Sequence, residues 1–181
     1  LLIYLSMGAV VGFFAGLLGI GGGLIIVPAL TFIFTAQDFP PDRILHLALG
    51  TTMATIIFTS AASLRAHHSY GAINWAIVKH ITPGIILGTF IGTTIASTLT
   101  NQVLSIIFVV FIFFAATQML LKLNPVPSFQ LPGKIGLFAA GNLIGAISSL
   151  VAIGGGLLSV PFLSICNVKL HQAIGTASAI G

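Results

Sequence analysis

The chain has 181 residues, of which 57% are hydrophobic and 4% charged, and its mean hydropathy is +1.17. A soluble domain carries about 25% charged residues, so this composition excludes a soluble protein and indicates a polytopic integral membrane protein. The net charge of +4 comes from six basic and two acidic residues. We interpret the basic residues as orientation signals in short loops and expect no nucleic-acid partner. The single Cys166 excludes a disulfide framework within the chain.

An apolar tract without charge covers residues 1–34 and contains three consecutive glycines, Gly21 to Gly23, followed by Val27-Pro28. As one straight helix the tract would be about 50 Å long, whereas the hydrocarbon core of a bilayer is about 30 Å thick. The glycines are the natural place for a break, because each weakens a helix by about 1 kcal/mol relative to alanine. Such a break at membrane depth is tolerated only where the freed backbone is buried in protein or faces a cavity.

The rest of the chain alternates between apolar segments and short loops. The predicted spanning helices cover 44–64, 75–99, 103–121 and 135–153, with a loop at 65–71 between the first two. Short apolar pieces follow at 24–34 and 157–165, directly after glycine runs, and a last helix begins near Leu170. Within 75–99, Gly84, Gly88 and Gly92 recur every four positions, which puts a smooth stripe on one helix face where another helix can approach closely.

An internal repeat organises the sequence. The run Gly21 to Gly23 with Val27-Pro28 returns 133 positions later as Gly154 to Gly156 with Val160-Pro161, and Leu45-His46 with Gly50-Thr51 returns 125 positions later as Leu170-His171 with Gly175-Thr176. We therefore expect a first transmembrane repeat over 1–123, a linker over 124–133, and the truncated start of a second repeat over 134–181.

Two topologies are open for the glycine-broken segments. The loops 65–74 and 122–134 hold basic residues and no acid, and should therefore be cytoplasmic. If 1–34 crosses the membrane once, the repeats are parallel; if it is a re-entrant hairpin, they are inverted. We favour the hairpin, because 24–34 and 157–165 are too short to span alone. The expected fold is an all-α polytopic membrane protein of two related, inverted repeats with glycine-broken, re-entrant helices.

Several motifs occur together in a set order. They are GLLGIGGG at 16–23 with VPAL at 27–30, ALGTT at 48–52, HSYGAINW at 68–75, and Pro83-Gly84 with Gly88 and Gly92. Over essentially all of 1–181 this order resembles the sulfite exporter TauE/SafE family. The resemblance implies two related halves and transport of sulfur-containing anions, such as sulfite, sulfonates or thiosulfate, across the bacterial inner membrane. The second half has Ser149 and Ala152 where the first has Gly16 and Gly19, so its turn is expected to differ.

The glycine breaks are the candidate anion site. A helix start presents unpaired N–H groups and about half a positive charge, so helices beginning near Leu24 and Leu157 could bind an anion without a buried cation. The alternative is that the glycines only permit close helix contacts. His46 and His171 could carry a proton or contact the anion, or cap helices at the interface. The candidate substrate-binding residues are Gly21, Gly22, Gly23, His46, Thr51, Gly154, Gly155, Gly156, His171 and Thr176.

The expected function is a membrane transporter for a small sulfur-containing anion, and the alternative is an anion channel with the same broken-helix site. Enzymes are disfavoured because no carboxylate lies within a predicted span and the Gly-x-Ser-x-Gly elbow is missing. We expect no cofactor and no metal. The expected partners are the anion and the lipid bilayer, and homo-oligomerisation stays open.

Overall fold

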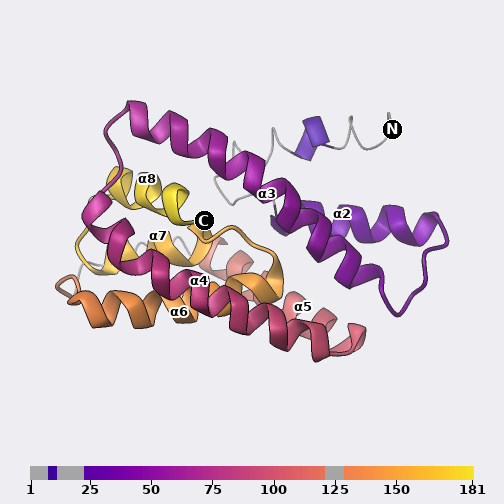
Figure 1. The fold of residues 1–181 in the computed structure, drawn as a ribbon. Coiled ribbons are helices and arrows are strands. Elements are labelled where there is room, and N and C mark those ends of the chain that lie inside the picture. Colours follow the sequence, from indigo (N-terminus) through magenta and orange to yellow (C-terminus); the bar gives the residue numbers. More distant parts are fainter. Residues whose placement is uncertain (1–7, 12–22, 121–128) are drawn as a thin grey trace.

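The computed structural model describes residues 8–11, 23–120 and 129–181, and all regular structure in these residues is helical (Figure 1). The helices are α2 (Gly23–Ala36), α3 (Ile44–Ser69), α4 (Trp75–Thr98), α5 (Asn101–Leu120), α6 (Lys134–Val151), α7 (Gly156–Ile165) and α8 (Leu170–Ile180). Within the described residues, four helices are long and apolar enough to cross a membrane, namely α3, α4, α5 over Asn101–Gln118, and α6. For the described residues, the prediction of helical structure is confirmed, and helices long and apolar enough to span a membrane lie in the four predicted places. The linker expected at 124–133 is described only from residue 129.

The loop expected at 65–71 is shorter than predicted. Helix α3 continues through Ser69, because neither glycine nor proline interrupts the sequence before Gly71. The helix then ends at Tyr70, and Gly71 takes a positive φ of 63° that favours glycine. The prediction that 65–69 belong to the loop is therefore wrong, whereas the start of α4 at Trp75 agrees with the sequence.

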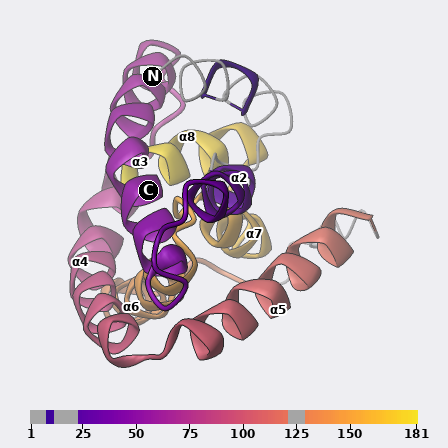
Figure 2. The same ribbon diagram turned by 90° about the vertical axis from the view of Figure 1, so that its right-hand side faces the viewer.

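Helices α4 and α6 pack with their backbones in direct contact, and they lie side by side in Figures 1 and 2. A Cβ added at Gly84 would collide with the carbonyl oxygen of Phe138, and one added at Gly88 with that of Asn142. Partner positions on both helices advance together, so α4 and α6 run parallel.

The glycine contact between these helices is reciprocal. On α6, a Cβ at Gly141 or Gly145 would collide with the carbonyl oxygen of Ile81 or Ile85 on α4. Small residues at four-residue spacing allow this approach within a membrane, where helix association depends on close van der Waals contact. The predicted smooth stripe on α4 is confirmed, and α6 is its partner.

Helix α6 ends at Ala152, which takes a left-handed φ of 49°, and α7 folds back from there. The backbone N–H of Phe129, ahead of α6, donates to the carbonyl oxygen of Ile165 at the end of α7 (3.2 Å). The end of α7 therefore lies beside the segment that leads into α6. The chain breaks at the second glycine run, as predicted.

Helix α8 packs against the loop between α3 and α4. A Cβ at Gly175 would lie 2.6 Å from the carbonyl oxygen of Ala72, and the Thr176 hydroxyl accepts a hydrogen bond from the Asn74 N–H (3.0 Å). The Asn74 side chain in turn caps α4 by accepting from the N–H groups of Ala76 and Ile77. Helix α8 thus contacts the start of α4, the helix against which α6 packs.

Helix α5 runs outward from the other helices, as Figure 2 shows. Leu104 and Phe108 bury their side chains in a core shared with α2 and the start of α3. Most other large apolar side chains of α5 are exposed, including Val110 and Phe113. An exposed apolar helix face of this size suits contact with lipid.

We predict that Gly88→Ala weakens the contact between α4 and α6, because the new methyl group has no room against the Asn142 carbonyl. Overpacking of this kind lowers the free energy of unfolding by about 1–3 kcal/mol. Thermal unfolding of the purified protein in detergent measures the effect. Gly50→Ala on α3 is the control, because its Cβ would meet no atom within 4 Å. Equal stability of both variants would contradict the backbone contact.

Candidate functional site

The start of α2 lies against the turn between α6 and α7. Gly23 is the first described residue of α2, and a Cβ added there would collide with the carbonyl oxygen of Ala152 and lie 3.2 Å from the Cα of Ile153. Ile153 comes three residues before the start of α7 at Gly156. The N-terminal ends of α2 and α7 therefore lie close together. Gly21 and Gly22, which were also predicted to bind substrate, lie outside the described residues.

The first backbone N–H groups of α7 have no acceptor within the helix. The N–H of Ile153 donates to the Ser148 carbonyl oxygen (3.2 Å), which closes the end of α6. The first bond of α7 runs from the Ser159 N–H to the Gly155 carbonyl oxygen (2.8 Å). The N–H groups of residues 156–158 precede this bond and have no intrahelical acceptor. They carry the partial positive charge of the helix start.

The glycines in this turn leave space beside those N–H groups. A Cβ at Gly156 would meet no described atom within 4 Å, and one at Gly154 would meet only Ile56 Cγ2, at 3.8 Å. At Gly155 the nearest atoms would be Gly181 Cα and Ser159 Oγ, both at 3.5 Å. This freedom contrasts with Gly23, whose position admits no side chain. In the second run, therefore, a side chain at Gly154 or Gly156 would meet no close contact among the described residues.

Two buried hydroxyl groups flank the turn, and the sequence reasoning missed both as site residues. The Oγ atoms of Ser148 and Ser159 are buried and have no hydrogen-bond partner among the described residues. The corresponding positions of the first repeat, 133 residues earlier, are Ala15 and Ile26. These serines occur in one half only, so the internal repeat could not identify them as site residues.

The two histidines lie away from the glycine-led helix starts. His46 is half-buried in the first turn of α3, with Nε2 3.2 Å from the Ala96 carbonyl oxygen, and His171 is exposed in the first turn of α8. His46 comes after the C-terminal end of α2, and His171 after that of α7. These helices have 14 and 10 residues and are about 20 and 15 Å long, so each histidine is about one helix length from the glycines. The structure does not bring either histidine to the glycine breaks.

The two threonines also lie outside the turn. Thr51 is exposed and donates to the Leu47 carbonyl oxygen (2.8 Å), within its own helix. Thr176 is fully buried, and its hydroxyl oxygen accepts from the Asn74 N–H. Of the predicted set, the structure thus groups Gly23 with Gly154, Gly155 and Gly156, and a binding role for the others stays a prediction.

An open hollow of about 500 Å³ lies at the opposite end of α2. It is lined by Thr31, Thr35, Asp38, Phe39, Pro41, Ile44 and Asn101. The carboxylate of Asp38 and the negative C-terminal end of α2 both disfavour an anion there. This hollow is therefore a poor candidate for binding an anionic substrate.

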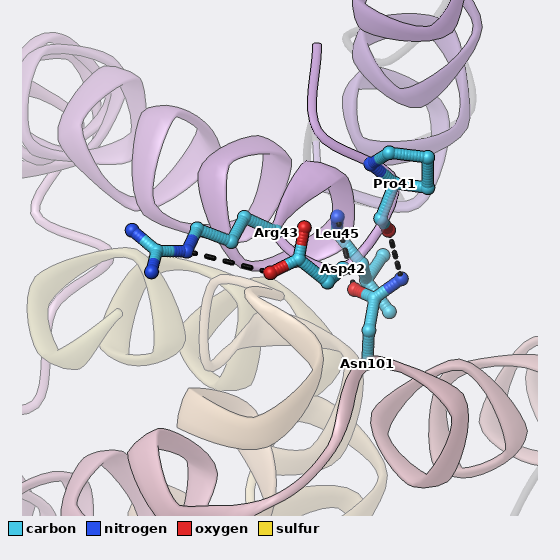
Figure 3. Close-up of polar contacts among 5 residues, drawn as sticks. All are labelled: Pro41, Asp42, Arg43, Leu45 and Asn101. Atoms are coloured by element: carbon cyan, nitrogen blue, oxygen red, sulfur yellow. Dashed lines mark hydrogen bonds and ion pairs between the residues drawn. The ribbon is translucent and has the colours of Figure 1, made fainter.

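Asn101, which lines this hollow, makes two hydrogen bonds to the backbone at the start of α3 (Figure 3). Its Oδ1 accepts from the Leu45 N–H (3.2 Å), and its Nδ2 donates to the Pro41 carbonyl oxygen (3.0 Å). The neighbouring ion pair of Asp42 and Arg43 is 3.6 Å long and exposed, so it contributes little to stability. Asn101 has a structural role, because it joins the start of α5 to the start of α3.

The described residues offer no obvious catalytic or metal chemistry. They contain no group of three or more His, Cys, Asp or Glu side chains that could hold a metal ion. Cys166 is buried, and burial raises the pKa of its thiol. The thiol therefore stays protonated at neutral pH and is a poor nucleophile.

The sequence is similar to those of proteins described as probable membrane transporters. The chain is 38% identical over 183 residues to a probable membrane transporter protein of Haemophilus influenzae, in an alignment that covers all of this chain and 69% of that protein. It is 28% identical to a probable membrane transporter protein of Methanocaldococcus jannaschii, over 98% of this chain and 67% of that protein. The identity to YunE of Bacillus subtilis, also described as a probable membrane transporter protein, is 25% over 90% of this chain and 67% of that protein.

No solved structure matches the chain. The family model described as sulfite exporter TauE/SafE matches residues 4–181. This match covers nearly the whole chain, and the relatives named above are all described as membrane transporters. The chain therefore belongs to the sulfite exporter TauE/SafE family of membrane transporters.

Proposed function

We propose that this protein moves a small sulfur-containing anion, of the sulfite, sulfonate or thiosulfate type, across the bacterial inner membrane. We further propose that the anion binds where the N-terminal ends of α2 and α7 meet. The observation that carries this site is the start of α7, where N–H groups without an intrahelical acceptor adjoin the open space at Gly156. The family's description as sulfite exporters supports the class of substrate.

An anion suits this place on electrostatic grounds. The start of α7 contributes about half a positive charge at the turn, and the first described residue of α2, Gly23, lies against the same turn. The surrounding side chains of Val27, Val151 and Ile153 are buried and apolar, so the N–H groups are screened less than they would be in water. A binding site of this kind holds the anion by hydrogen bonds and releases it without having to break a strong ion pair.

The path of α6 and α7 supports the re-entrant arrangement that we favour. Helix α6 has 18 residues and α7 only 10, about 27 and 15 Å, so α7 is too short to cross the bilayer core. Its end returns to the segment ahead of α6 through the bond between Phe129 and Ile165. The turn would then lie within the membrane, as expected for a transport site between inverted repeats.

The charged residues support the proposed orientation. Lys134 begins α6, and Lys169 follows the end of α7, which returns to the same end of the hairpin. Because α4 and α6 run parallel, the loop after Arg65 lies at that end as well. A shared basic end is typical of the cytoplasmic side.

An anion channel remains the alternative function, because the same site would serve a pore. Flux through reconstituted protein distinguishes the two classes. A carrier saturates with substrate and responds to an opposing proton gradient, whereas a channel conducts without saturation over the same range.

We predict that Gly156→Val abolishes most transport, because the new side chain occupies the space beside the N–H groups that have no intrahelical acceptor. The helix itself should persist, since the substitution replaces the residue least suited to a helix apart from proline. Initial uptake of radiolabelled sulfite into proteoliposomes with matched protein levels should fall by about 100-fold, and Gly155→Val should act in the same direction.

Gly50→Val is the matched control for Gly156→Val, because both glycines have open surroundings but Gly50 lies on α3. This control should retain uptake within about twofold. Normal uptake by Gly156→Val and Gly155→Val would move the binding site away from the glycine run and leave only the family to support the substrate.

We also predict that transport keeps its pH dependence in the double variant His46→Gln, His171→Gln. Both histidines lie about one helix length from the proposed site, and sulfite itself titrates near neutral pH, so the substrate can carry the coupling. The measurement is uptake into proteoliposomes between about pH 5.5 and 8, because this is the range in which a histidine side chain ordinarily changes its charge. Loss of the pH dependence in the double variant would instead assign proton transfer to the histidines.

A further inference from the structure

Ser159 is a buried hydroxyl group without a hydrogen-bond partner in the described part of the chain. It is the fourth residue of α7, it is fully buried, and its Oγ makes no hydrogen bond there. Several other helical hydroxyls donate to a carbonyl of the preceding turn, as Thr52 does to Ala48 (2.7 Å) and Ser105 to Asn101 (2.8 Å), whereas the buried hydroxyl oxygens of Thr82, Ser148 and Ser164 share the lack of a partner with Ser159. Buried polar groups are nearly always paired, so the Ser159 hydroxyl calls for a partner.

The Ser159 hydroxyl is turned toward the N-terminal end of α7. Its Oγ would lie 3.5 Å from a Cβ placed on Gly155, the residue that caps the helix. The N–H groups of residues 156–158 are at this same end, and the position of a Gly156 side chain is open. An O–H donor and several N–H donors therefore converge on one small region at the start of a ten-residue helix.

We propose that Ser159 is a substrate-binding residue that donates its hydroxyl hydrogen to an oxygen of the bound anion. This inference rests on the proposed function and specifies the substrate class. An anion that presents several oxygens can accept from the Ser159 hydroxyl and from the N–H groups of α7 at the same time. Sulfite, sulfonates and thiosulfate all have this property, whereas chloride offers a single sphere without directed acceptors. The site thus selects for oxyanions.

The variant Ser159→Ala tests this, with Ser164→Ala as the matched control. Ser164 is a half-buried serine of α7 whose Oγ is likewise buried without a partner among the described residues, but it lies in the last turn, away from the glycines. In the purified full chain reconstituted into proteoliposomes, Ser159→Ala should raise the KM for sulfite by about ten- to a hundredfold, as expected for one lost hydrogen bond to a charged group. Ser164→Ala should leave the KM within about twofold.

A second substitution separates the hydroxyl from the volume of the side chain. Ser159→Cys keeps a similar size, but its S–H is a weak donor, so its KM should rise as in Ser159→Ala. Inhibition of sulfite uptake by excess chloride should become stronger relative to wild type in both variants, because only the oxyanion loses a donor. Thermal unfolding in detergent should remain unchanged or shift upward, since the substitution to alanine removes an unpaired buried group.

The outcomes distinguish this inference from the proposed function. If wild-type protein transports sulfite and Ser159→Ala and Ser159→Cys do so with unchanged KM, the role of Ser159 is wrong and the proposed function stands. An equal rise in KM for Ser159→Ala and Ser164→Ala would assign the effect to the general structure of α7 and also overturn the inference. If wild-type protein neither binds nor transports sulfite, sulfonate or thiosulfate, the proposed function fails and the role of Ser159 falls with it.

Discussion

The contact between Gly23 and the turn at Ala152 is the constraint on which the candidate site depends. The two backbones touch there, and any side chain at position 23 would force the start of α2 away from the turn. The turn follows directly after α6, and reciprocal glycine contacts with α4 fix the position of α6. Close backbone approach is thus used twice, once to join two spanning helices and once to bring two helix starts together. Without it, Gly23 of α2 would not lie beside the turn that leads into α7.

Much of the helical framework could be predicted because it depends on local properties of the sequence. The length of an apolar run, its interruption by glycines and the four-residue spacing of Gly84, Gly88 and Gly92 are all visible without knowledge of neighbours. They gave the starts of α3 and α4, the break after α6 and the short α7, each close to its observed position. The end of α3 was misplaced because the polar residues Arg65 to Ser69 were interpreted as loop, although none of them breaks a helix.

The site could be predicted only in part, because its remaining features depend on contacts between distant segments. The hydroxyl of Thr176 meets the backbone of Asn74, and His46 meets that of Ala96, over separations of 102 and 50 residues. The internal repeat is a poor guide to such contacts. Gly175 is packed against Ala72, whereas its counterpart Gly50 has open surroundings, so equal sequences have unequal neighbours. Ser159 stands out only once its burial and its missing partner are known.

The most direct test of the central claim is to locate the anion itself. Selenite has the shape and charge of sulfite, and the anomalous scattering of selenium identifies its position in crystals of the protein. We predict a selenium peak at the start of α7, within hydrogen-bond distance of the Gly156 N–H, that disappears when excess sulfite is added. A peak displaced by sulfite at any other place, such as the basic end near Lys134 and Lys169, with none at the glycine turn, would contradict it.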